Sequence, residues 1–302
     1  MKVFIDGKLY PKEEAKISVW DHGFLYGDGV FEGIRVYNKK IFKLNEHLER
    51  LYYSANVIDL NIPYDYQELK GIVKEVVRIN LEEENWENAY IRLVVSRGVG
   101  DLGLDPRKCS KPTVVIIVDK IQLYPKEYYE KGLKVIISSF RRPSADILSP
   151  RIKSLNYLNN ILAKIEANYS NCQEAVMLNS QGYITECTAD NIFIVKNDVV
   201  ITPPPYVGIL EGITRASVID ICRELNIKVK EDIIDIKDLI NADEVFLTGT
   251  GAEIIPVSEI NGKKVRYCPG DITTKIREYF PKYVSFWSTP VYDEEISQFP
   301  YG

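Results

Sequence analysis

The sequence contains few of the side chains that carry most catalysis at neutral pH. Its two histidines, His22 and His47, stand far apart, so neither a zinc motif nor a nucleophile paired with histidine is evident. The cysteines form no C-x-x-C pair, which favours reduced thiols in the cytoplasm over a disulfide framework. They are Cys109, Cys172, Cys187, Cys222 and Cys268. An enzyme of this composition must use lysine, tyrosine, carboxylates or a cofactor.

A basic excess, a long apolar run and an apolar leader are also missing. The 43 acidic residues outnumber the 38 basic ones and give a net charge of −5, which argues against nucleic acid as the main partner. No run approaches the roughly 20 apolar residues that span a bilayer. The start, MKVFIDGKLY, lacks a signal-peptide pattern. We therefore expect no membrane association and a cytoplasmic location.

The composition is otherwise that of a globular protein, with 45% hydrophobic residues in a chain of 302, and its length suits one large domain or two medium ones. Strand-like and helix-like segments are mixed along the chain, which predicts an α+β fold. The segment QLYPKEYYEKG, 122–132, interrupts the pattern with a proline and charges, so we interpret it as an interdomain loop. The predicted domains are a smaller N-terminal one, 1–121, and a larger C-terminal one, 133–302.

Lys153 is the first candidate for chemistry, because it directly precedes a predicted helix. The helix is indicated by apolar residues at helical spacing from Leu155 onward, which should anchor it to the core. A lysine at a helix start is usually a solvated residue. Near apolar walls and other cations, its neutral amine forms a Schiff base with an aldehyde. Tyr157 lies four residues on and can share its face. Three asparagines of this stretch have no evident role: Asn156, Asn159 and Asn160.

Arg50 and Glu186 are candidates of opposite charge. A helix is predicted over 45–59, with Asn45 as its N-cap and Arg50 at the edge of its buried face. Arg50 is either a surface residue or a bidentate phosphate ligand. Glu186, in YITECTADNIF (183–193), is either an exposed turn carboxylate or the partner of a protonated ring nitrogen, which it would strengthen as an electron sink.

Two Thr/Gly clusters can hold an anion. EGITRAS, 211–217, begins a predicted helix, where backbone N–H groups favour a negative ligand. LTGTGAE, 247–253, ends a strand in a turn of small residues that let backbone donors approach closely. Each cluster is as well explained by an ordinary cap or turn, and neither matches a nucleotide-binding fingerprint. Together with Lys153, Arg50 and Glu186, however, they predict a site for pyridoxal 5′-phosphate.

Seven motifs in both halves resemble the class IV, or fold type IV, aminotransferases, and within them the branched-chain amino acid aminotransferases. The resemblance implies a two-domain α+β fold with a small N-terminal α/β sandwich and a larger C-terminal pseudo-barrel flanked by helices. The motifs are HGFLYGDGVFEGIRVY (22–37), HLERLYYSA (47–55), AYIRLVVSRG (89–98), IKSLNYLNNILAKIEA (152–167), ITECTADNIF (184–193), GILEGITRAS (208–217) and FLTGTGAEIIPV (246–257).

The resemblance also implies residue roles. Lys153 is similar to the family's Schiff-base lysine and proton shuttle, Glu186 to the partner of the pyridine nitrogen, and Tyr157 to the partner of the ring O3′. A phosphate cup is implied at Arg50, Ile213, Thr214 and Thr250, with Leu210 against the pyridine face. The implied substrate pocket consists of Tyr26, Phe31, Gly33, Tyr90, Arg92, Gly251 and Ala252. The ECTAD stretch differs from the Gly/Ser-rich sequence that is common after this glutamate in the family. The resemblance therefore does not assign the contacts that Cys187 and Thr188 make near the ring.

The activity implied is transamination of branched-chain L-amino acids (leucine, isoleucine, valine) with 2-oxoglutarate to give 2-oxo acids and L-glutamate. Relatives of the same fold leave alternatives: a D-amino acid or (R)-amine transaminase, an aminodeoxychorismate lyase, or a pyridoxal phosphate-binding protein without turnover. The family also implies a homodimer or a higher homo-oligomer, with each site bordered by a partner loop. Loop 98–104 and Tyr26 match those bordering elements.

Overall fold

A computed structural model describes residues 1–292 and divides the chain into two compact units. Of the described residues, unit 1 comprises Met1–Ile121, Ile152–Asn156 and 284–292, and unit 2 comprises Gln122–Arg151 and Tyr157–Tyr283. Two short segments of the predicted C-terminal domain, 152–156 and 284–292, thus pack within unit 1. The end of that predicted domain, 293–302, lies outside the described residues.

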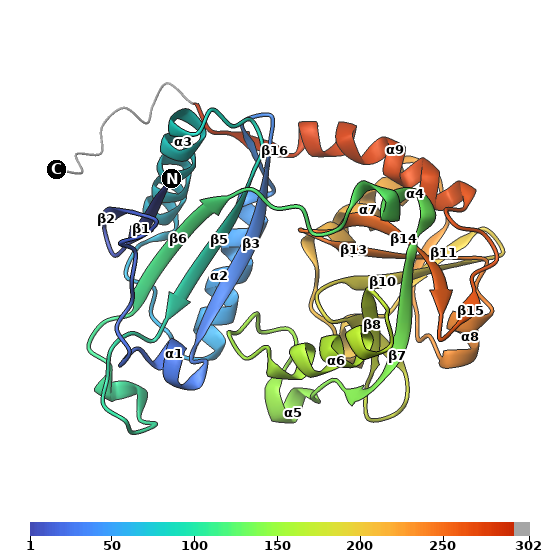
Figure 1. The fold of residues 1–302 in the computed structure, drawn as a ribbon, viewed down its shortest axis with the longest axis horizontal. Helices are drawn as coiled ribbons and strands as arrows, with labels where there is room; N and C mark the ends of the chain where they lie inside the picture. Colours follow the sequence, from blue (N-terminus) through green and yellow to red (C-terminus); the bar gives the residue numbers. More distant parts are fainter. Residues whose placement is uncertain (293–302) are drawn as a thin grey trace. The chain divides into compact units, whose positions relative to one another are not determined.

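Unit 1 is a two-layer α/β sandwich, as predicted (Figure 1). Its seven strands have the order β16-β4-β3-β5-β6-β1-β2, and every pairing is antiparallel. Helices α2 and α3 cover one face, because fully buried residues such as Leu48, Leu51 and Val73 share one core with the sheet. The strands are β1 (Lys2–Ile5), β2 (Lys8–Pro11), β3 (Gly29–Tyr37), β4 (Lys40–Phe42), β5 (Ala89–Ser96), β6 (Thr113–Asp119) and β16 (Ser288–Pro290). The helices are α1 (His22–Tyr26), α2 (Leu44–Val57), α3 (Tyr66–Glu83) and the 3₁₀ turn η1 (Pro106–Lys108).

Unit 2 contains the predicted pseudo-barrel with flanking helices (Figure 1). Six strands close into a ring in the order β9-β10-β13-β14-β7-β8, since β8 pairs β9 and β9 pairs β10. The ring strands are β7 (Leu133–Arg141), β8 (Glu174–Leu178), β9 (Ile184–Cys187), β10 (Asn191–Lys196), β13 (Glu244–Gly249) and β14 (Glu253–Ile260); β11 (Val199–Thr202), β12 (Val229–Glu231) and β15 (Lys263–Lys264) extend it. Around them lie α4 (Lys126–Lys131), α5 (Ala145–Leu148), α6 (Leu158–Tyr169), η2 (Pro205–Val207), α7 (Ile213–Glu224), α8 (Ile236–Ile240) and α9 (Asp271–Phe286).

Several predicted helix boundaries are wrong. Helix α2 begins at Leu44, and its N-cap position is Lys43, which has a φ of 51° and no side-chain cap bond, so Asn45 is not the N-cap. The segment 122–132 is not a plain loop, because it contains α4. Helix α6 begins at Leu158, three residues later than the apolar pattern predicted. Lys153 therefore stands well ahead of the helix.

The apolar face of α6 is not the face that packs on the barrel. Ala163 and Ala167 are fully buried, whereas Leu158, Ile161 and Ile165 are 67%, 50% and 42% exposed. Small residues on the inner face let the helix lie close to β7 and β8, where Ala163 and Ala167 share a cluster with buried side chains of both strands. Periodicity identified the helix and misassigned its buried side, because alanine contributes little to an apolar pattern.

Among residues 1–292, none of the helices combines the length and the apolar character that crossing a bilayer requires.

Candidate active site

Lys153 lies on an extended segment that pairs with β3 of unit 1. The N–H of Phe31 donates to the Lys153 carbonyl at 3.0 Å, and the N–H of Leu155 donates to the Gly29 carbonyl at 2.9 Å. The N–H of Lys153 donates to Ser54 Oγ on α2 at 3.2 Å. These bonds fix the backbone of Lys153 between a strand and a helix. They also explain why α6 starts late: a segment that pairs with β3 through a β-bridge at Ser154 has an extended backbone and cannot be helical.

Four of the predicted pocket residues lie together beside Lys153. Its Nζ is 4.6 Å from the centroid of the Phe31 ring. The guanidinium carbon of Arg92 is 4.5 Å from the same ring and 5.6 Å from the Tyr90 ring. Gly33 has no side chain for a steric reason, since a Cβ there would come within 2.1 Å of the Tyr90 hydroxyl oxygen. Strands β3 and β5 thus present an aromatic wall with a cation at its edge.

Tyr26 has a different environment from this group. Its hydroxyl donates to the carbonyl of Leu102 at 2.6 Å, and its ring packs edge-on against His22. The ring nitrogen Nε2 of His22 is 2.7 Å from the Asp101 carbonyl. Tyr26 is therefore tied to loop 98–104, and in unit 1 these contacts join α1 to that loop.

Arg50 is held by a buried carboxylate that the sequence did not single out. Its Nε and Nη2 donate to the two oxygens of Glu32, each at 2.7 Å, and Glu32 is fully buried on β3. His47 Nδ1 lies 2.7 Å from Oε2 of the same carboxylate. His47, Arg50 and Ser54 project from α2 at helical spacing, so one face of this helix contacts both Glu32 and the Lys153 backbone.

Electrostatics explains the charge states of this cluster. Burial alone raises the pKa of Glu32, but the adjacent Arg50 and His47 outweigh burial and hold that pKa at about 2. Burial lowers the pKa of His47, and the positive charges of Arg50 and Lys153 add to the effect against the opposing Glu32. At neutral pH the carboxylate is therefore ionised and the imidazole is neutral, so His47 donates its Nδ1 proton to Glu32.

In unit 2, Glu186 lies on β9 and is almost fully buried. Its Oε1 accepts from Arg142 Nη2 at 2.6 Å, while Oε2 accepts from the Leu210 N–H at 3.0 Å and from Asn191 Nδ2 at 3.3 Å. Asn191 Nδ2 also donates to the Leu210 carbonyl at 2.9 Å. Of the two interpretations of Glu186, the exposed turn is wrong, because the carboxylate is buried in a strand.

The start of α7 adjoins this carboxylate through Asn191. Its N-cap, Gly212, makes no side-chain cap bond. A Cβ at Gly212 would come within 2.0 Å of Asn191 Oδ1, so a larger residue here would displace the Asn191 side chain. Ile213 and Thr214 form the first turn, whose N–H groups favour an anion.

The turn between β13 and β14 supplies further small residues of the predicted site, Thr250, Gly251 and Ala252. It follows Thr248, which pairs with Asn191 across the β10–β13 ladder. The Oγ1 of Thr248 is buried and has no hydrogen-bond partner among the described residues. The carbonyl of Ala252 accepts from the Tyr129 hydroxyl at 3.0 Å, which fixes the end of the turn.

The three asparagines after Lys153 now have a physical account. Asn156 Nδ2 donates to the Gly27 carbonyl at 2.8 Å in unit 1. In unit 2, Asn159 Nδ2 donates to the Arg141 carbonyl at 2.9 Å, and Asn160 accepts from Arg142 Nη1 at 2.9 Å. The asparagines are thus side-chain anchors on each side of Tyr157, which occupies the N-cap position of α6.

The open question at Cys187 and Thr188 is partly answered. Cys187 is buried in the apolar core of unit 2, and burial raises its pKa well above the ordinary value, so the thiol is protonated and inert. The Thr188 carbonyl accepts from Asn160 Nδ2 at 2.6 Å.

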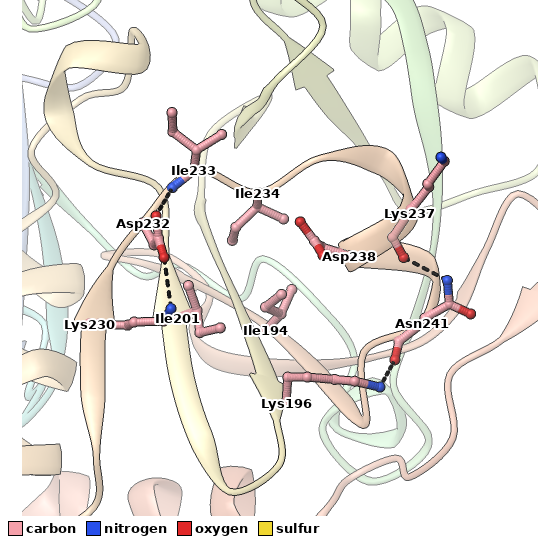
Figure 2. A pocket seen from close by; sticks show the side chains of 10 residues that line it. All are labelled: Ile194, Lys196, Ile201, Lys230, Asp232, Ile233, Ile234, Lys237, Asp238 and Asn241. Carbon is pink, nitrogen blue, oxygen red and sulfur yellow. Dashed lines mark hydrogen bonds and ion pairs between the residues drawn. The ribbon is translucent and has the colours of Figure 1, made fainter.

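A surface pocket of about 290 Å³ in unit 2 is not the candidate site (Figure 2). Several of its polar groups already have partners: Lys230 Nζ donates to Asp232 at 2.7 Å, Lys196 Nζ donates to the Asn241 carbonyl, and Asp238 accepts from the N–H of Asp235, which lies outside the pocket lining. None of the predicted site residues lines it. Nor do residues 1–292 contain a cluster of histidine, cysteine and carboxylate side chains able to hold a metal ion.

The family model of class IV amino-transferases matches residues 29–260. The chain belongs to the class IV aminotransferases. A Methanocaldococcus jannaschii protein whose name assigns it provisionally to the branched-chain-amino-acid aminotransferases is 50% identical over 97% of this chain and 100% of its own length. A D-alanine aminotransferase of Listeria monocytogenes is 36% identical over 93% of this chain and 95% of its own.

Solved structures of similar enzymes share the fold of this class IV aminotransferase. One is the T.th. branched-chain amino acid aminotransferase complexed with N-(5′-phosphopyridoxyl)-L-glutamate. It superposes with a TM-score of 0.89 at 34% identity, covering 96% of this chain and 98% of that one. The fold expected from the motif resemblance is therefore confirmed.

Sequence reasoning missed the residues that hold the predicted site residues of this aminotransferase in place. They are Glu32, His47, Ser54, Arg142, Asn160 and Asn191. A signal existed only for Asn160, a polar residue on the small-residue face of α6 that also carries Ala163 and Ala167. The others depend on contacts between elements far apart in the chain.

Glu32→Gln should lower the free energy of unfolding by about 3 kcal/mol at pH 7, because it leaves the buried Arg50 without its charge partner. The folded-state pKa of Glu32 is about 2 and its ordinary value is 4.5. Its contribution is therefore complete above the ordinary pKa and is lost as the pH falls towards the folded-state pKa. Urea unfolding of the wild type and the variant should be measured at about pH 7, 5 and 3. The difference between their free energies of unfolding should decrease as the pH falls.

Glu82→Gln is the control, since Glu82 pairs with Arg78 on an exposed face of α3. Its loss should cost less than about 1 kcal/mol. If the difference in free energy of unfolding between the wild type and Glu32→Gln stayed constant from neutral to acidic pH, the Glu32 carboxylate would not stabilise the fold through its charge.

Proposed function

We propose that this aminotransferase uses pyridoxal 5′-phosphate to transfer the amino group of branched-chain L-amino acids to 2-oxoglutarate, giving 2-oxo acids and L-glutamate. The observation that carries the proposal is the Phe31 ring, which has Lys153 Nζ at 4.6 Å and the Arg92 guanidinium at 4.5 Å. A reactive amine, an aromatic wall and a fixed cation thus lie side by side. Such a pocket can accept both the aliphatic side chain of one substrate and the carboxylate side chain of the other.

The donor set fits the cofactor. A phosphate suits the uncapped start of α7 and the buried Thr248 hydroxyl nearby, while a pyridinium nitrogen suits the ionised Glu186. When bound, pyridoxal phosphate supplies an aldehyde for the amino group and a ring that takes up the electron pair released at Cα. The residues proposed to hold it are Arg50, Lys153, Tyr157, Glu186, Leu210, Ile213, Thr214 and Thr250.

The protein residues then have distinct tasks. The Lys153 amine would hold the cofactor aldehyde and would move a proton between the substrate Cα and the cofactor C4′. The N–H groups of Gly251 and Ala252 are proposed to bind the substrate α-carboxylate. The side chain of the substrate is proposed to be surrounded by Tyr26, Phe31, Gly33, Tyr90 and Arg92.

A D-amino acid or (R)-amine transaminase is the second candidate, favoured by the 36% identity to a D-alanine aminotransferase. The first candidate is favoured by the greater identity to a protein named for branched-chain substrates and by the L-glutamate adduct of a structural relative.

The cysteines of the described chain are all free thiols, which fits the reducing cytoplasm that we propose as the location of the protein.

Lys153→Ala should give a colourless protein with kcat lowered by at least about 10³-fold, because the amine that holds the aldehyde and moves the proton is gone. Borohydride reduction of the yellow wild type followed by peptide mapping should find the cofactor on Lys153. Lys134→Ala, a change at an exposed lysine, is the control and should stay yellow. Undiminished transamination by Lys153→Ala would refute the assignment.

A substrate panel separates the two candidate functions. With 2-oxoglutarate as acceptor, kcat/KM for L-leucine, L-isoleucine and L-valine should exceed that for D-alanine and (R)-1-phenylethylamine by at least roughly tenfold, since the chain has its greater identity to a protein named for branched-chain substrates. The measurement is chiral chromatography of the product, which detects L-glutamate and D-glutamate separately. Preference for D-alanine or the amine would establish the second candidate instead.

We also propose that the protein is a homodimer or a higher homo-oligomer. In unit 1, α1 with its preceding loop and loop 98–104 expose several large apolar side chains, with Phe24 67%, Leu102 63% and Leu104 78% exposed. The two segments are joined by the bond from the Gly100 N–H to the Trp20 carbonyl and by the Tyr26 hydroxyl. A contiguous exposed apolar patch of this kind usually marks an interface.

The double variant Phe24→Ser, Leu102→Ser should shift the protein to monomer in light scattering at micromolar concentration, because it removes apolar area from the patch. Tyr267→Ser changes an exposed aromatic residue of unit 2 and should leave the mass unchanged. An unaltered oligomer in the double variant would show that this patch is not the interface.

A further inference from the structure

Glu186 has a charged partner within the protein, although its proposed task is to bind a charged ring nitrogen. Arg142 Nη2 donates to its Oε1 at 2.6 Å, and both side chains are less than a tenth exposed. The other oxygen accepts from the Leu210 N–H and from Asn191. The carboxylate is thus oriented by three donors from three separate segments of unit 2.

Arg142 is itself fixed in place. Its backbone N–H donates to the Leu178 carbonyl at 2.9 Å, and its Nη1 donates to Asn160 Oδ1 at 2.9 Å. The Nδ2 of Asn160 donates to the Thr188 carbonyl at 2.6 Å. Asn160 lies on α6, two residues into the helix that follows Lys153 and Tyr157. The guanidinium therefore has a defined position between β7, α6 and the segment after β9.

A buried carboxylate without a cation tends to bind a proton and become neutral. Beside a pyridine ring, the proton it would take is the one shared with the ring nitrogen. A fixed arginine stabilises the carboxylate anion, so the shared proton stays on the nitrogen and the ring keeps its positive charge. A positively charged ring is the stronger electron sink.

We propose that Arg142, held by Asn160, is a positioning residue that keeps Glu186 ionised and thereby keeps the cofactor ring nitrogen protonated. The inference rests on the proposed function, because it requires pyridoxal phosphate at Glu186. It differs from a structural ion pair in one respect: a structural pair affects stability alone, whereas this one sets the protonation state of a ligand atom.

The test uses the holoenzyme loaded with pyridoxal phosphate that carries ¹⁵N in the ring. The ¹⁵N chemical shift distinguishes the protonated from the unprotonated nitrogen and does not depend on turnover. Wild type should keep the protonated signal across neutral and mildly alkaline pH, whereas Arg142→Met should shift towards the unprotonated signal. Arg142→Lys restores the charge without the planar fork and should lie between them.

Kinetics give a second readout. In Arg142→Met, kcat should fall by about 10- to 100-fold, the range seen when a residue that orients a ligand is removed. KM for the amino acid should change by less than about threefold, because Arg142 acts on the electron sink and makes no substrate contact. Asn160→Ala should shift the ring signal in the same direction by a smaller amount.

Arg97→Met is the matched control, because Arg97 is a buried arginine of unit 1 paired with Asp28. It should lower stability and leave the ¹⁵N signal at its wild-type position.

A folded Arg142→Met protein with the wild-type signal overturns the inference, whatever its activity. If that variant does not fold, a wild-type signal in Asn160→Ala overturns it. Failure of the wild type to bind pyridoxal phosphate overturns the proposed function as well, so the two failures are distinct.

Discussion

The pairing of residues 152–156 with β3 is the constraint on which the rest of unit 1's candidate site depends. Two backbone bonds, from the Phe31 N–H to the Lys153 carbonyl and from the Leu155 N–H to the Gly29 carbonyl, place the lysine against the aromatic wall. The bond to Ser54 adds α2 to the same framework. The lysine backbone is thus set by main-chain hydrogen bonds, which tolerate little displacement, and the flexible side chain begins from a fixed point.

Each unit also contains a buried carboxylate held by an arginine: Glu32 with Arg50 and Glu186 with Arg142. Removing such charges from water is costly, and the cost is offset only where every lone pair is well bonded. Each carboxylate accepts at least three hydrogen bonds, with His47 among the donors at Glu32 and Asn191 among those at Glu186. The arrangement fits a protein that must keep charges in fixed places and fixed protonation states, rather than one that uses ion pairs for stability.

Much of the fold followed from sequence. The motifs predicted the sandwich and the pseudo-barrel, and the structure confirms both. Where prediction failed, tertiary contacts had overridden local pattern. Helix α6 begins late because Leu155 is committed to β3, and its alanine face is buried because small residues fit against β7 and β8. The asparagines looked unexplained because their partners, Gly27, Arg141 and Thr188, belong to other elements.

The sequence by itself determined the family, the α+β class and which residues are chemically able to hold a pyridoxal phosphate, because motif spacing and residue type are local properties of the chain. Only the tertiary structure decided how those residues are held. Arg50 is clamped by Glu32, Glu186 is paired with Arg142, and Tyr26 is tied to Leu102. No periodicity encodes these contacts, since each joins separate segments of the chain, and the energy of a buried charge is set by its neighbours in space.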